Sequence, residues 1–166
     1  MDTLWAPWRI DYIQRPKPEG CIFCACSIVD DDEKTLIVHR GSRCFVILNR
    51  YPYNNGHLMV VPFAHESSIE MVEMAALAEL MALTRLSLAV LREAMHPGGF
   101  NIGINQGAAA GAGVADHVHL HVVPRWAGDT NFMPVLSETR VMPQSLESVY
   151  HVLARGFALE RPASGK

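Results

Sequence analysis

Polar and apolar residues alternate strictly along residues 116–125. His117, His119 and His121 take every second position, and aliphatic residues fill the positions between them. A period of two is typical of a β-strand, and Pro124 closes the run. Because successive side chains of a strand point to opposite faces, all three imidazoles are predicted to share one face. This alignment indicates chemistry, since imidazole is a nucleophile, a proton shuttle and a metal ligand near neutral pH.

Similar patterns predict further strands. Short runs rich in β-branched and aliphatic residues, bounded by turn formers, occupy residues 35–39, 44–49, 57–62 and 100–106. The link over residues 50–56 is dense in Pro, Asn and Gly, so the runs on either side of it are predicted to be neighbouring antiparallel strands. Together with the histidine run, these segments predict a mainly antiparallel sheet of about five strands.

Two helices complete the predicted α+β fold. The apolar residues of 69–95 cover more than one helical stripe, which indicates a long helix buried against both the sheet and a neighbour. Ser67 and Ser68 are expected to cap its start, and Pro97 follows its end. A second helix is predicted over residues 145–157. Four methionines are interpreted as core residues of the long helix: Met71, Met74, Met81 and Met95.

The composition indicates one compact domain. A chain of 166 residues, 49% of them hydrophobic, is long enough to bury a core. A net charge of −3 without a Lys/Arg cluster argues against a nucleic-acid partner, and the charged residues within 69–95 argue against a membrane span. The N-terminus lacks the pattern of a signal peptide. We divide the chain into an aromatic N-terminal arm (1–20), a domain (21–157) and a polar tail (158–166), with the arm expected to pack over the body or a partner subunit.

Three of the four cysteines lie close together, at Cys21, Cys24 and Cys26. Without a secretion signal, this crowding favours metal binding in a reducing cytoplasm over a disulfide framework. The Cys-x-x-Cys spacing supplies two of the four ligands that zinc prefers, and the other two must then be histidines. The candidates are His57, His65 and His117. Such a closed site would be structural; a redox role is the alternative, but nothing around the pair resembles thioredoxin.

Residues 107–115 are a loop of three glycines and five alanines that leads into the histidine run. Small side chains leave backbone N–H groups accessible, which suits phosphate oxygens. Phosphate held against imidazoles favours nucleophilic attack by a histidine and a covalent phosphoramidate, with no need for magnesium. Asn49 follows a predicted strand and is open to two interpretations, a cap of the next loop or a partner of a ribose hydroxyl.

These segments together resemble the histidine triad (HIT) superfamily of nucleotidyl hydrolases and transferases. The resemblance lies in His117-x-His119-x-His121 and in the segments 47–49, 56–62 and 101–107, in the family's order, and it extends over nearly the whole chain. The segments 48–62 and 121–126 are most similar to bacterial diadenosine tetraphosphate phosphorylases and related dinucleoside polyphosphate hydrolases. The resemblance implies a HIT-like fold for the domain.

The resemblance also implies separate roles for the catalytic histidines His117, His119 and His121. His119 would be the nucleophile that becomes nucleotidylated, and His121 would contact the phosphates and assist the leaving group. Substrate contacts are implied for Ile47 at the base, Asn49 at the ribose, Gly113 and Val114 at the α-phosphate, and Asn105. The ligands of zinc-bearing members match Cys21, Cys24, His65 and His117, which leaves His57 as a supporting residue.

The activity that the resemblance implies is cleavage of a dinucleoside polyphosphate at the α-phosphate, with an AMP-type product. It also implies a homodimer, with the long helix and central strands at the interface, and no organic cofactor. Many HIT hydrolases carry Gln and then Ser or Thr before the triad, where this loop reads Gly111-Ala-Gly-Val and is one residue longer. Both departures favour phosphate over water as the acceptor. The alternatives are a nucleoside phosphoramidase, a generic HIT nucleotide hydrolase, and a non-catalytic nucleotide- or metal-binding module.

Overall fold

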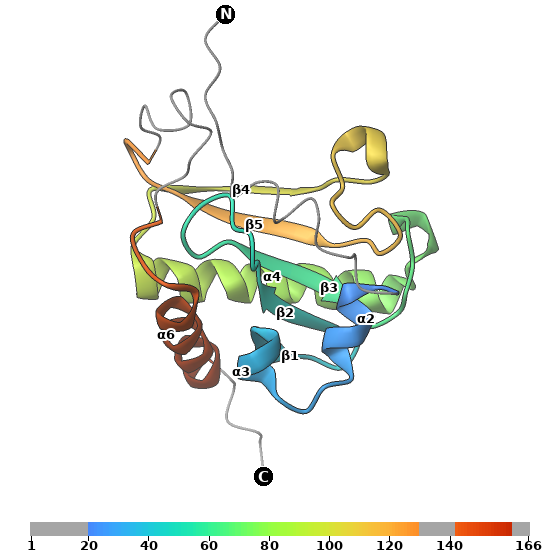
Figure 1. Cartoon of the computed structure of the whole chain (residues 1–166), viewed down its shortest axis with the longest axis horizontal. Coiled ribbons are helices and arrows are strands. Elements are labelled where there is room, and N and C mark those ends of the chain that lie inside the picture. Colours follow the sequence, from blue (N-terminus) through green and yellow to red (C-terminus); the bar gives the residue numbers. More distant parts are fainter. Residues whose placement is uncertain (1–19, 130–141, 161–166) are drawn as a thin grey trace, which may run out of the picture.

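The computed structural model describes residues 20–129 and 142–160 (Figure 1). Five strands form one antiparallel sheet in the order β1-β2-β3-β5-β4. They are β1 (Ile37–Arg40), β2 (Cys44–Leu48), β3 (Leu58–Pro62), β4 (Gly99–Ile104) and β5 (Leu120–Arg125). The predicted α+β class and antiparallel sheet are confirmed. The predicted arm, apart from Gly20, and residues 161–166 of the tail lie outside the described residues.

The sheet separates two apolar clusters. On one face, side chains of β2, β3 and β5 such as Val46, Val60 and Val122 pack with helix α4 (Met74–Met95) and helix α6 (Leu146–Leu159). Figure 1 shows α4 running along this face. On the opposite face, the smaller cluster joins Phe23 to residues of β1, β2 and β3, namely Ile37, Phe45, Ile47, Met59 and Val61. Strands β2 and β3 are therefore buried on both faces, as their continuous apolar sequences predict.

Helix α4 begins at Met74, so the predicted start at residue 69 is wrong. Residues Ile69–Met71 form a separate 3₁₀ turn, and Glu73 stands at the N-cap of α4. Neither Ser67 nor Ser68 caps α4, and the hydroxyl of Ser68 donates to the carboxylate of Glu70. The backbone N–H of Ile69 donates to the side chain of Gln106 at 2.9 Å, so a distant partner holds the predicted start of the helix.

The prediction that the methionines fill the core is also wrong for three of the four. Met71, Met74 and Met81 have exposed fractions of 67%, 76% and 52%. The side chains that α4 buries lie on its sheet-facing stripe, and only Met95 packs against that cluster. By length and composition alone α4 would pass as a membrane span, but within the described chain it packs against β2, β3 and β5.

The histidine run is only partly a strand. Strand β5 begins at Leu120, so His117 and His119 precede it and only His121 lies within it. The reason is a different partner for the backbone, since the N–H of Val118 donates to the carbonyl of Glu66 at 2.7 Å rather than to a neighbouring strand. The predicted segregation of faces holds nevertheless, because Val118 and Leu120 belong to the larger cluster on the α4 side.

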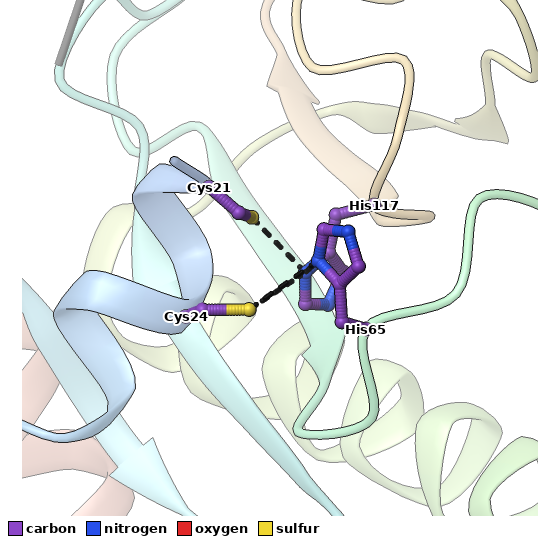
Figure 2. A group of neighbouring side chains, drawn as sticks. All are labelled: Cys21, Cys24, His65 and His117. Carbon is purple, nitrogen blue, oxygen red and sulfur yellow. Dashed lines mark hydrogen bonds between the residues drawn. The ribbon is translucent and has the colours of Figure 1, made fainter. Parts of the chain in front are cut away.

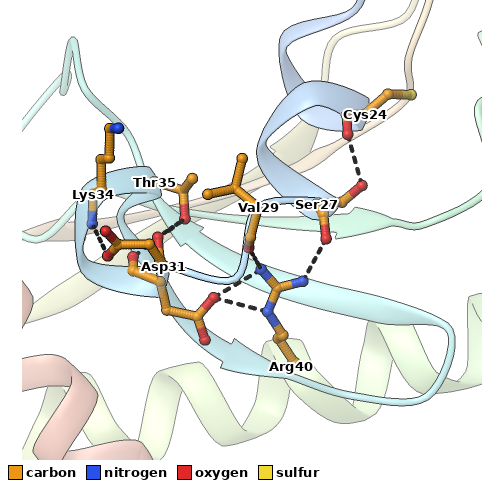
Figure 3. A network of polar contacts seen from close by, with 8 residues as sticks. Cys24, Ser27, Val29, Asp31, Lys34, Thr35 and Arg40 are labelled. Carbon is orange, nitrogen blue, oxygen red and sulfur yellow. Dashed lines mark hydrogen bonds and ion pairs between the residues drawn. The ribbon is translucent and has the colours of Figure 1, made fainter.

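Two short helices and α6 complete the described chain. Helices α2 (Ile22–Ser27) and α3 (Asp32–Thr35) precede β1, and neither is among the two helices predicted from the sequence. Arg40 links β1 to both short helices. Its guanidinium donates to the carbonyls of Ser27 and Val29, at and just after the end of α2, and to the carboxylate of Asp32 in α3 (Figure 3). Helix α6 begins one residue after the predicted start, with Ser145 as its cap.

Candidate functional site

The three histidines of the run are buried on the face of the sheet opposite α4. His117, His119 and His121 have exposed fractions of only 1%, 2% and 9%. The rings of His119 and His121 meet edge to face, with centroids 4.7 Å apart. Cross-strand pairing places His121 beside Met59 of β3, and Met59 in turn beside Ile47 of β2. The histidine that is expected to contact phosphates therefore lies in one row with the residue that is expected to line the base pocket.

A backbone carbonyl sets the tautomer of His119. The Nδ1 of His119 lies 2.9 Å from the carbonyl oxygen of His117. A carbonyl only accepts hydrogen bonds, so Nδ1 must carry the proton and donate it. The lone pair of neutral His119 is then on Nε2, at the far side of the ring. This arrangement fixes the ring and presents Nε2 as a nucleophile.

A second histidine sets the opposite arrangement at His121. The backbone N–H of Tyr53 donates to Nδ1 of His57 at 3.0 Å, so neutral His57 carries its proton on Nε2. That Nε2 lies 2.9 Å from Nδ1 of His121 and donates to it. The proton of neutral His121 is therefore on Nε2, where it is available to a phosphate oxygen. The two histidines thus present a lone pair and an N–H respectively.

Burial keeps both imidazoles neutral near physiological pH. Removal from water lowers the pKa of His119, against a smaller opposing effect of its hydrogen bond to the His117 carbonyl. Burial and then the neighbouring His119 lower the pKa of His121 to about 4. A neutral His119 has the lone pair that attack requires, and a neutral His121 still donates through its N–H.

Four side chains converge into a second cluster beside the histidines (Figure 2). They are Cys21, Cys24, His65 and His117, and their ligand atoms all lie within 4.8 Å of one another. The Sγ–Nδ1 distances are 3.2 Å, 3.4 Å and 3.6 Å, and the two Nδ1 atoms are 3.3 Å apart. Tetrahedral zinc with ordinary bond lengths gives separations of about 3.6 Å between S and N and about 3.3 Å between two N atoms. The geometry of the cluster therefore fits zinc.

The hydrogen bonds and charges around this cluster fit a cation as well. The Nε2 of His117 donates to the carbonyl of Pro62 at 2.9 Å, so the lone pair of His117 is on Nδ1, which faces the thiols. Burial first, and then the neighbouring Cys21, raise the pKa of the Cys24 thiol. Two neighbouring thiolates repel each other, and a divalent cation bound between them would remove this repulsion. His57 lies outside the cluster, with His121, and Cys26 is not among the converging side chains.

The remaining predicted residues come from β2 and the segment after it, the end of β4, and the loop before the histidine run. Ile47 belongs to the smaller apolar cluster and Val114 packs against it, whereas Gly113 is exposed in the loop. Asn105 follows the Ile104–Leu120 pair that ends the pairing of β4 with β5, on the side of His119. Asn49 caps the next loop, since its Oδ1 accepts from the N–H of Tyr51, and its Nδ2 lies 3.3 Å from Nδ1 of His57. Its role at the ribose stays a prediction.

Comparison with known proteins decides the family. A model of the HIT domain matches residues 31–128. The chain belongs to the HIT family. The AP-4-A phosphorylase of Mycobacterium tuberculosis (strain CDC 1551 / Oshkosh) is 39% identical over 166 aligned residues, which cover 95% of this chain and 85% of that protein. The chain is therefore a HIT-family enzyme.

Solved structures of HIT proteins share the fold. A Zn-bound histidine triad family protein from Mycobacterium smegmatis has a TM-score of 0.68 and 33% identity, over 84% of this chain and 94% of that one. A hypothetical histidine triad nucleotide-binding protein from Sulfolobus tokodaii strain7 has a TM-score of 0.67 and 25% identity, over 84% and 93%. The zinc of the first protein is consistent with the Cys₂His₂ cluster of this HIT chain.

Two aromatic residues of this HIT site were not singled out by the sequence. Phe23, between the two clustered cysteines, has its ring centroid 5.0 Å from His119 and 5.4 Å from His117. Tyr53, in the loop after β2, has its ring centroid 4.7 Å from His57 and 5.6 Å from His121. Neither residue differs from its sequence neighbours in a way that indicates function, because Phe23 is an ordinary apolar residue and Tyr53 belongs to a predicted turn.

Proposed function

We propose that this HIT enzyme cleaves dinucleoside polyphosphates at the α-phosphate, with diadenosine tetraphosphate as the principal substrate and inorganic phosphate as the second acceptor. The observation that carries the proposal is the bond from Nδ1 of His119 to the His117 carbonyl, which presents Nε2 beside His121. The identity of 39% with an AP-4-A phosphorylase supports the choice of substrate. The loop that lacks a side-chain hydroxyl at Gly111–Val114 supports the choice of acceptor.

The first step forms a covalent intermediate. Nε2 of His119 attacks the α-phosphorus, and the bond from that phosphorus to the bridging oxygen breaks. The electron pair leaves on this oxygen as part of ATP, while Nε2–H of His121 donates a hydrogen bond to it. The backbone amides of Gly113 and Val114 hold the non-bridging oxygens. The His117 carbonyl stabilises the positive charge that develops on the ring of His119, because it accepts from Nδ1–H.

The second step releases the nucleotide. An oxygen of inorganic phosphate attacks the same phosphorus, the P–N bond breaks, and its electron pair returns to Nε2 of His119. Diadenosine tetraphosphate and phosphate thus give ATP and ADP, with the enzyme regenerated. Water in place of phosphate would give ATP and AMP. Asn49 and Ile47 bind the ribose and base, and Asn105 lies beside the phosphates.

We further infer that Cys21, Cys24, His65 and His117 bind zinc. A closed set of two thiolates and two imidazoles leaves no position for substrate, so the metal would stabilise the fold and take no part in a chemical step. A second copy of the chain is expected along β4, since β4 is an edge of the sheet and Ile102 on it is 47% exposed. The central strands β3 and β5 are each paired on both sides within the sheet. We therefore place the subunit interface at the edge strand β4 rather than at these central strands.

Product analysis tests the function. Purified enzyme is incubated with diadenosine tetraphosphate, with and without inorganic phosphate, and the nucleotides are separated. ADP and ATP in equal amounts, formed only with phosphate, would support phosphorolysis, whereas ATP and AMP would indicate hydrolysis. Quenching in denaturant at neutral pH, followed by mass spectrometry, should find AMP attached to His119. Replacing His119 by alanine should lower kcat by about 10⁴-fold or more, as loss of a nucleophile does.

Two other functions share parts of this site. A nucleoside phosphoramidase would form the same intermediate from a substrate with an amine leaving group, so it would turn over a phosphoramidate faster than the dinucleotide. A binding module would retain nucleotide without turnover and without labelled His119. The same analysis, repeated with a nucleoside phosphoramidate as a second substrate, therefore separates all three.

A further inference from the structure

Five aromatic rings form a continuous row across the candidate active site. In order they belong to Phe23, His119, His121, His57 and Tyr53, with centroid separations of 5.0 Å, 4.7 Å, 5.1 Å and 4.7 Å. The two ends of the row differ. Phe23 is 1% exposed and closes the row within the smaller apolar cluster. Tyr53 is 47% exposed and opens it to solvent.

Tyr53 is held in place by its backbone. Its N–H donates to Nδ1 of His57, and its ring lies tilted over His57 at 37° and over His121 at 32°. The next residue, Asn54, is anchored as well, since its Nδ2 donates to the carbonyl of Pro124 at 3.1 Å and to Asp129 at 2.7 Å. The backbone of the loop therefore holds Tyr53 in a fixed position, and this reduces the conformational entropy that is lost when a ligand stacks on its ring.

We propose that Tyr53 is the stacking platform for the second nucleoside of the substrate, the one that departs with the leaving group. This inference rests on the proposed function. The first nucleoside belongs with Ile47 and Asn49, and its α-phosphate with His119. The leaving chain departs past His121, and Tyr53 is the aromatic ring that contacts His121 from the exposed side. Every nucleobase has a π-face, so an accessible tyrosine ring binds a base without fixing its identity.

This assignment gives the site a preference that the histidines alone cannot provide. The triad, the loop amides and Asn49 act on one nucleotide and its phosphates. A ring beyond His121 rewards a substrate that carries a second base on its leaving group, and so favours a dinucleoside polyphosphate over a mononucleotide with the same phosphate chain. The departing product is then a nucleotide rather than inorganic polyphosphate.

Two substrates that differ only in the second nucleoside test the platform. Diadenosine tetraphosphate and adenosine 5′-tetraphosphate undergo the same attack at the α-phosphate, but the second releases tripolyphosphate. Replacing Tyr53 by leucine should raise KM for diadenosine tetraphosphate by about tenfold, the effect of one lost base stack, and leave KM for adenosine tetraphosphate unchanged. Tyr53→Phe, which keeps the ring, should match the wild type with both substrates. Any residue except proline preserves the N–H that orients His57.

Tyr51 provides the matched control. It lies on the same loop and is 54% exposed, but it is not one of the five rings of the row. Tyr51→Leu should leave both KM values unchanged. An equal fall of kcat for both substrates in Tyr53→Leu would overturn the platform and make Tyr53 a support of His57. Unchanged kinetics in that variant, or a loss in Tyr51→Leu instead, would also overturn it. Failure of the wild type to cleave diadenosine tetraphosphate would refute the proposed function itself, and the platform with it.

Discussion

His119 and His121 are chemically identical side chains that the fold makes different. Nδ1 of His119 faces a backbone carbonyl, and Nδ1 of His121 faces the N–H of another imidazole. The first contact leaves a lone pair on Nε2, and the second leaves a proton there. The proton of His121 is on Nε2 because the Tyr53 amide donates to Nδ1 of His57 and so leaves the proton of His57 on the nitrogen that faces His121. A nucleophile and a hydrogen-bond donor are thus obtained from the same residue type without charging either ring.

Keeping these rings neutral makes folding sensitive to acid. The pKa of His121 falls from an ordinary 6.5 to about 4 in the folded chain, mainly through burial. Below pH 6.5 the unfolded chain therefore binds a proton that the folded chain does not, so stability is present above this pH and is lost as the pH falls towards 4. Urea denaturation between about pH 7 and about pH 4.5 should show a loss on the order of 2 kcal/mol from this residue.

A variant separates His121 from the other histidines. His121→Gln keeps a polar side chain of similar length but does not titrate, so its free energy of unfolding should depend less steeply on pH than that of the wild type. Both proteins carry the same cysteine–histidine cluster, and acid release of a metal affects both alike. Parallel pH dependences would show that His121 does not retain its lowered pKa in the folded protein.

At the scale of elements, one carboxylate joins the β1–β2 turn to helix α4. Glu79 of α4 accepts hydrogen bonds from the backbone N–H groups of Ser42 and Arg43 at 2.6 Å and 2.7 Å. Gly41 precedes them, and a Cβ atom at that position would clash with the same carboxylate. The missing side chain of Gly41 is therefore what allows the turn and the helix to approach.

A double-mutant cycle measures this contact. Glu79→Ala should destabilise the protein by about 1–3 kcal/mol, because two charge-assisted bonds to backbone amides are lost. Gly41→Ala should cost a similar amount in the wild type, since the added methyl group displaces the carboxylate. It should cost clearly less when Glu79 is already alanine. Additive free energies of unfolding in urea would contradict the proposed steric link.

The elements themselves were largely predictable, because burial of strands leaves a local signature. The apolar runs at 44–49 and 57–62 correspond to β2 and β3 within one residue at each end. The errors occurred where a distant partner binds the backbone. The carbonyl of Glu66 takes the N–H of Val118 and delays β5, and the side chain of Gln106 takes the N–H of Ile69 in the 3₁₀ turn that precedes α4. No periodicity in the sequence encodes either competitor.

At the scale of the whole molecule, the cysteine–histidine cluster joins three distant segments. Helix α2 and its N-cap provide Cys24 and Cys21, the segment after β3 provides His65, and the segment before β5 provides His117 (Figure 2). The resemblance placed His117 among the zinc ligands and two residues before the nucleophile His119, so the adjacency of the cluster and the active site was predicted, whereas the contribution of Phe23 was not. Phe23 reaches His119 only because α2 folds back over the sheet, and that contact spans most of the chain.

Metal removal should therefore affect more than one part of the protein. Helix α2 has only six residues and no side-chain cap, so it has little stability of its own. The buried Phe23, which is 1% exposed, and the bond from Arg40 to the Ser27 carbonyl attach it to the sheet, and a metal on Cys21 and Cys24 would add a third link. A chelator should lower Tm by roughly 10 °C, since loss of a structural metal costs several kcal/mol and each one shifts Tm by about 2–4 °C in a domain of this size.

Cysteine variants show whether the cluster is the cause. Cys24→Ser should lose the metal, measured as zinc per chain by elemental analysis, and should melt like the chelated wild type. Cys26→Ser changes a cysteine of the same helix outside the cluster, so it should keep the metal and the full response to chelator. Loss of zinc from Cys26→Ser, or a Tm of the wild type that does not respond to chelator, would contradict the proposal. Either result would show that a metal on the four converging side chains does not attach α2 to the active-site face of the sheet.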